Sequence, residues 1–156
     1  MDKIKSYITD NLSGEMKETA LAFVEYLYDN GFVFWKDNCA CWKDKIYYWV
    51  KYGEECVCFI AIKDPDEPNN RWTVWSEDSS AYEDFSVDEN IKNIGWSHID
   101  FCGRCGSCAG GKTKNIFGKV FKRVCGCTFR VDNAKLCDLP FLKKMVDLRK
   151  QEIIKT

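Results

Sequence analysis

The segment of residues 98–127 constrains this chain more than any other, because it holds five of the ten cysteines and the only histidine. Three of these cysteines follow the spacing Cys-x-x-Cys-x-x-Cys, and the other two form a later Cys-x-Cys pair. They are Cys102, Cys105, Cys108, Cys125 and Cys127. Glycines between them permit the tight turns that bring several sulfurs to one ion. The segment therefore predicts a metal-binding loop.

The predicted ligands are Cys102, Cys105, Cys108 and Cys125. We favour Cys125 over Cys127 because it lies at the start of a predicted strand, nearer the loop. Cys127 and His98 are the alternates. Thiolates at this density select zinc, with iron as the alternative ion. Four protein ligands close a tetrahedral zinc site, so the site is expected to be structural and not catalytic.

Two other motifs in the segment are less well supported. A ferredoxin-type run needs a further cysteine where this chain has Lys112. Residues 106–113 match the phosphate-loop pattern GxxxxGK[ST], but that loop needs an apolar strand before it and a helix after it. The preceding HIDF is short and polar, and Gly118 interrupts a following helix. Nucleotide binding is therefore not expected.

The remaining cysteines have two interpretations. The pairs Cys39–Cys41 and Cys56–Cys58 could form a second four-sulfur site if their strands are adjacent. However, Cys56 and Cys58 alternate with apolar residues inside a predicted strand, where cysteine behaves as a small hydrophobe. Cys137 is also predicted to pack in the interior.

Length and composition favour one domain over residues 1–156. No apolar run approaches the roughly 20 residues of a membrane span, and the N-terminus has no apolar core of a signal peptide. We therefore expect a cytoplasmic protein that does not enter membranes. In that compartment the cysteines would be thiols or metal ligands, and disulfides are not expected.

Periodicity predicts an α+β fold, with an antiparallel sheet flanked by N- and C-terminal helices and a cysteine-rich metal-binding loop before the last strand. The predicted helices cover residues 14–30, capped by Ser13, residues 87–96, capped by Asp88, and a final helix capped by Asp138. The predicted strands cover residues 32–35, a hairpin at 45–62, and residues 71–76 and 125–131. In the last strand, alternation places Cys125, Cys127, Phe129 and Val131 on one face.

The charges are segregated along the chain. Residues 64–89 contain nine acids and one base, whereas residues 102–127 contain six bases and no acid. The basic segment is either a solvated loop or a site for an anion or phosphate. Six aromatic residues could line a ligand cleft or fill the core: Tyr47, Tyr48, Trp49, Tyr52, Trp72 and Trp75. Stacking of nucleic-acid bases on them is opposed by the acidic loop beside them.

Residues from 127 onward, CTFRVDNAKLCDLPFLKKMVDLRKQE, resemble the end of a bacterial family of small frataxin-like domains, which is mostly of unknown function. The matching features are the TFRVDN strand, the Leu139-Pro140 helix start and the Arg149 to Glu152 helix end. The resemblance implies a helix-flanked antiparallel sheet, and one member of the family is described as an iron chaperone. Iron delivery in such domains uses an acidic helix, whereas the first helix predicted here has only scattered acids. The cysteine-rich segment departs from the family as an insertion.

The sequence thus predicts a zinc-binding domain with a structural thiolate site that acts as a binding or interaction module. Its partner would be a protein or a small-molecule ligand, and nucleic acid is not expected. No serine, cysteine or carboxylate has a recognisable catalytic partner in the sequence. The hypothesis that the protein is an enzyme is therefore less favoured than that of a binding module. The alternatives are a chaperone that handles iron or zinc, and a thiol redox protein or enzyme.

Overall fold

The computed structural model describes residues 2–37, 45–103 and 110–156. Within these ranges the elements are α1 (Asp2–Asn11), α2 (Gly14–Asp29), β1 (Val33–Lys36), β2 (Ile46–Tyr52), β3 (Glu55–Ile62), β4 (Trp72–Ser76), α3 (Ala81–Asp84), α4 (Glu89–Ser97), β5 (Ile99–Phe101), β6 (Lys112–Ile116), β7 (Lys119–Asp132), the 3-10 helix η2 (Leu136–Asp138) and α5 (Leu139–Lys155).

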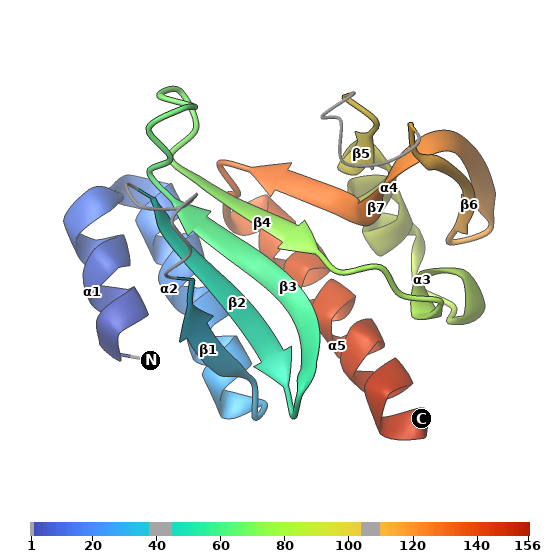
Figure 1. Ribbon diagram of the computed structural model, residues 1–156, viewed down its shortest axis with the longest axis horizontal. Helices are drawn as coiled ribbons and strands as arrows, with labels where there is room; N and C mark the ends of the chain where they lie inside the picture. The colour runs from blue at the N-terminus through green and yellow to red at the C-terminus, as the bar shows by residue number, and fades with distance from the viewer. Residues whose placement is uncertain (1, 38–44, 104–109) are drawn as a thin grey trace.

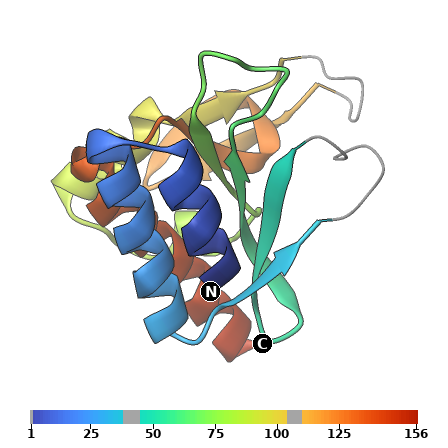
Figure 2. The same cartoon turned by 90° about the vertical axis from the view of Figure 1, so that its left-hand side faces the viewer.

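The described strands form one antiparallel sheet in the order β1-β2-β3-β4-β7-β5, and β6 pairs with β7. Helices α1, α2 and α5 lie together on one face of the β1–β4 part (Figures 1 and 2). The opposite end carries β5, β6, α3 and α4 around the first half of β7. This architecture confirms the predicted α+β class, with its antiparallel sheet and its N- and C-terminal helices.

The core lies between this sheet and the helices. Tyr48 and Val50 of β2 pair with Ile60 and Cys58 of β3, and all four are buried. Strand side chains alternate between the two faces of a sheet, so the residues between these point away from the helices. The helices contribute a matching set of buried residues, which includes Phe23, Val24, Leu27, Phe141, Leu142 and Met145.

Several predicted elements are confirmed with small changes at their ends. The hairpin at 45–62 is β2–β3, and the Asp88 side chain accepts a hydrogen bond from Ile91 N at the start of α4. Ser13 stands at the N-cap of α2, but its side chain makes no capping bond. The short helix α4 continues through Gly95 to Ser97. Gly95 is buried there. A larger residue would not fit at this position, because an added Cβ would lie 2.9 Å from the rings of Phe117 and Phe141.

Two predictions about the C-terminal half need correction. The basic segment 112–123 is not a loop, because β6 and β7 pair as a hairpin with Ile116 opposite Lys119. The predicted strand 125–131 is the second half of the 14-residue β7, and its strict alternation breaks at Thr128. This residue has a φ of 73°, and both Thr128 and Phe129 are buried. None of the described helices is long and apolar enough to cross a membrane.

Candidate metal centre

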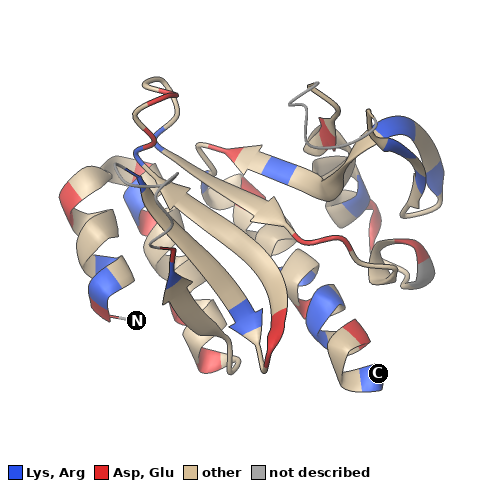
Figure 3. Cartoon of the chain, in the orientation of Figure 1, with Lys and Arg blue, Asp and Glu red and all other residues tan. Residues whose placement is uncertain are grey.

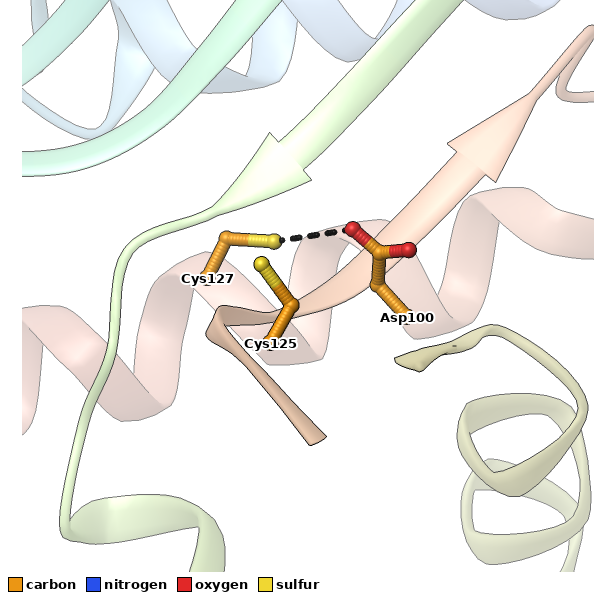
Figure 4. A group of neighbouring side chains, drawn as sticks. All are labelled: Asp100, Cys125 and Cys127. Carbon is orange, nitrogen blue, oxygen red and sulfur yellow. Dashed lines mark hydrogen bonds between the residues drawn. The ribbon is translucent and has the colours of Figure 1, made fainter. Parts of the chain in front are cut away.

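Three potential metal ligands meet where β5 faces β7. Atoms of the Asp100 carboxylate, the Cys125 thiol and the Cys127 thiol all lie within 4.8 Å of one another, and each residue is half-buried (Figure 4). The Cys127 Sγ lies 3.3 Å from Asp100 Oδ2 and donates a hydrogen bond to it. Two sulfurs and one carboxylate oxygen are a donor set that suits zinc.

A bulge in β7 brings the two thiols to Asp100. Ile99 pairs with Phe129 and Phe101 pairs with Val124. Between these two pairs β5 advances by two positions along the chain, whereas β7 advances by five. The extra residues of β7 are the ones that carry the Cys-Gly-Cys pair. A bulge of this kind bends the strand and redirects its side chains, which is a common arrangement beside functional sites. The 4.8 Å cluster therefore depends on this local break in the ladder.

Polar contacts from neighbouring elements hold the bulge. The Lys114 Nζ of β6 donates to Gly126 O at 3.2 Å and to Thr128 Oγ1 at 2.7 Å. The same ammonium group pairs with Asp78 at 2.9 Å. The hydroxyl of Ser76, at the end of β4, donates to Cys127 O and accepts from Phe129 N. The backbone on both sides of Cys127 is thus fixed by side chains that would not touch the ion.

The electrostatics of the cluster favour a cation. Burial raises the pKa of the Cys127 thiol well above its ordinary value, and the nearby Asp100 and Cys125 raise it further. The protonated form of the Cys127 thiol is therefore favoured when no cation lies beside it. A divalent ion would offset this effect and would release the thiol protons when it binds.

The structure places the predicted ligands unequally. Cys125 is in the cluster, together with Cys127, which was the alternate to it. Cys102 follows β5 directly, and its backbone N donates to Arg123 O at 2.7 Å, two residues before Cys125. Cys105 and Cys108 lie outside the described residues. Sequence reasoning missed Asp100, although its position two residues before Cys102 puts both on the same side of an extended strand.

The alternate ligand His98 has a different partner. Its Nε2 lies 3.0 Å from Asp138 Oδ1, and its ring stacks on Phe141. Asp138 also accepts from Lys135 N, and its side chain makes no capping bond to α5. His98 thus joins α4 to the start of α5, and it does not belong to the described cluster.

The cysteines of β3 behave as packing residues. Cys58 is fully buried, and burial raises the pKa of its thiol well above the ordinary value. Burial, together with the charge of Glu77, raises the pKa of Cys56 to about 12. Cys39 and Cys41, the other half of the predicted second site, lie outside the described residues. Cys137 is exposed on η2, so the prediction that it packs in the interior is wrong.

The aromatic residues of the sheet divide between its two faces. Tyr48 and Trp72 belong to the core, whereas Trp35, Trp49, Phe59 and Trp75 form a cross-strand row on the face without helices. Arg130 ends this row, with its guanidinium 5.0 Å from the Trp75 ring centroid. Trp35 is 58% exposed, so part of the row contacts solvent.

The fold and this site define an α+β protein with a candidate thiolate–carboxylate metal centre at a strand bulge. No protein-family model, curated protein or solved structure matches the chain. The function is therefore inferred from the site itself.

Proposed function

We propose that this chain binds zinc at the bulge of β7 and uses the ion as a structural crosslink in a binding module. The observation that carries the proposal is the convergence of Asp100, Cys125 and Cys127 within 4.8 Å. In a tetrahedral site, zinc–sulfur and zinc–oxygen bonds of about 2.3 and 2.0 Å put neighbouring sulfur and oxygen atoms about 3.5 Å apart. The Sγ–Oδ2 distance of 3.3 Å between Cys127 and Asp100 agrees with that value.

Cys102 is the proposed fourth ligand. Its hydrogen bond to Arg123 O joins the end of β5 to β7 just before Cys125. A thiolate from this position would close the coordination sphere, and a closed sphere serves structure rather than catalysis. Cys105 and Cys108 stay predictions from the sequence, either of which would replace the carboxylate of Asp100.

The crosslink would tie a short strand at one end of the sheet to its neighbour. Strand β5 has only three residues and pairs only with β7 among the described strands. Zinc bound between Asp100 and the two thiols of β7 would tie these strands together. Metal-binding free energy then contributes directly to folding of this part of the chain.

Zinc content and cobalt substitution test the proposal. Protein purified without added metal should contain about one equivalent of zinc, and Co²⁺ should give sulfur-to-cobalt charge-transfer absorption. Cys127→Ser should lose most of that absorption. Cys137→Ser is the matched control, because it removes an exposed thiol outside the site. Zinc below about half an equivalent, or an unchanged cobalt spectrum in Cys127→Ser, would contradict the proposal.

A second candidate function is the transfer of zinc or iron to a partner. It is favoured by the half-burial of Asp100, Cys125 and Cys127. A carrier must release its metal, and a site near the surface allows a chelator or partner to reach it. This candidate predicts that a mild chelator removes the metal without unfolding the protein, and that the unfolding temperature falls only slightly. A structural crosslink predicts that the same loss lowers the unfolding temperature.

A further inference from the structure

The β6–β7 hairpin carries a concentration of positive charge, which Figure 3 shows along both of its strands. We call residues 112–123 the basic hairpin. Lys112, Lys119, Lys122 and Arg123 are exposed, and none of them forms an ion pair with any described residue. Lys114 differs, because it is paired with Asp78. Four exposed cations on a short ribbon, without an ion-pair partner among the described residues, would attract a polyanion.

Aromatic rings lie among these cations. The Lys119 Nζ is 5.2 Å from the Trp96 ring centroid and 5.4 Å from that of Phe121. The Phe121 ring is 6.3 Å from that of Phe101, which is 52% exposed at the end of β5. Lys119 thus lies beside the half-buried rings of Trp96 and Phe121, and the exposed ring of Phe101 lies next to Phe121.

We propose that the basic hairpin and Phe101 form a binding surface for single-stranded nucleic acid. The exposed cations would contact phosphates, and the exposed ring would stack on a base. Duplexes hide the faces of their bases, so a surface that combines rings with cations favours single strands. An acidic protein segment would use the cations but has no planar base for Phe101 to stack on.

The acidic residues near the hairpin leave this charge in place. Asp78 is held by Lys114, and Asp100 faces the two thiols of the candidate metal centre. Glu83 lines a cavity of about 480 Å³ beside Lys112 and Lys114, so it lowers the positive potential on that side. The sequence-based expectation against nucleic acid rested on the acidic loop beside the aromatic sheet, and the basic hairpin is a different surface.

Fluorescence anisotropy with a labelled 12-nucleotide oligouridine tests the proposal on the full chain. The surface should bind this strand more tightly than a duplex of equal length or a polyglutamate peptide of equal charge. The double variant Lys112→Glu with Lys122→Glu should lose most of this affinity. Phe101→Ala should weaken binding about tenfold through lost stacking. Two cations that contact phosphates add about 1.4 to the slope of log affinity against log salt concentration. Replacing both Lys112 and Lys122 with neutral glutamine should therefore reduce that slope by about 1.4.

Matched controls separate the site from general charge effects. Lys3→Glu with Lys63→Glu makes the same change in net charge on exposed residues outside the hairpin, and Tyr28→Ala removes an exposed ring outside the hairpin. Both should bind like the parent chain. Equal losses in the two charge-reversed variants, tighter binding to polyglutamate, or no change in Phe101→Ala would overturn the proposal. The zinc measurements do not use the oligonucleotide, so the two proposals can fail separately. Zinc binding can be absent while the surface binds the oligonucleotide, and zinc can bind while the surface does not.

Discussion

At the scale of single residues, Lys114 connects three features of the candidate centre. Its ammonium group holds Gly126 O and the Thr128 hydroxyl on the β7 bulge, and it pairs with Asp78 before α3. Gly126 lies between the two cysteines, so this one side chain restrains the backbone from which both thiols project. A half-buried donor in this position supports a metal site in the way that hydrogen-bonded outer partners support its ligands.

Lys114→Met should weaken zinc binding by about 10-fold or more, because loss of an outer partner typically costs about 10–100-fold in metal affinity. The variant keeps the length of the side chain but removes every donor. Competition with a chromophoric chelator measures the affinity. Lys112→Met is the matched control on the same strand, since Lys112 is exposed and makes no ion pair with a described residue. Equal zinc affinities for the two variants would show that the bulge does not depend on Lys114.

At the scale of elements, the turn into β6 depends on Gly111. Its φ is +88°, and an added Cβ would lie 2.7 Å from the carbonyl carbon of Arg123. The glycine therefore allows the chain to pass β7 closely enough for Lys112 to pair with Val124. Gly118, in the β6–β7 turn, has a similar φ of +87° but has no atoms within 4 Å of an added Cβ.

This contrast gives a matched pair of substitutions. Gly118→Ala should cost about 1–2 kcal/mol in the free energy of unfolding, because only the left-handed conformation is penalised. Gly111→Ala should cost about 1–3 kcal/mol more, because its Cβ overlaps the backbone of β7. Chemical denaturation of both variants measures the difference. Equal costs would mean that β6 moves away from β7 without loss of stability.

The elements also show what sequence patterns can predict here. The β2–β3 hairpin is predictable because aromatic and β-branched residues cluster on both sides of a Gly53-Glu54 turn. Helix α1 is not, because only Ile4 and Ile8 are buried in an otherwise polar segment. Strands β5 and β6 are short, and their pairing depends on the bulge in β7. Asp100 was missed for the same reason, since no local pattern shows that β7 turns two thiols toward it.

At the scale of the whole molecule, the two ends of the sheet differ in how near they lie to the candidate metal centre. Strands β1–β4 lie against α1, α2 and α5, and a continuous apolar core fills the space between them. Strands β5 and β6 lie at the other end, where they pair with β7 beside the candidate centre (Figure 1), and Ile99 and Ile116 join them to the same core. A metal at this centre would act mainly on the end that holds β5 and β6.

Hydrogen exchange before and after chelation tests this division. Removing the metal should speed the exchange of amides in β5 and β6, because β7 is their only partner strand among the described residues. Amides in β2 and β3 should keep their rates, because their strands lie over the apolar core. Cys127→Ser should show the chelated pattern without any chelator, and Cys137→Ser should not. Equal acceleration at both ends of the sheet would mean that the metal stabilises the molecule as one cooperative unit, and no acceleration would mean that the crosslink carries no folding energy.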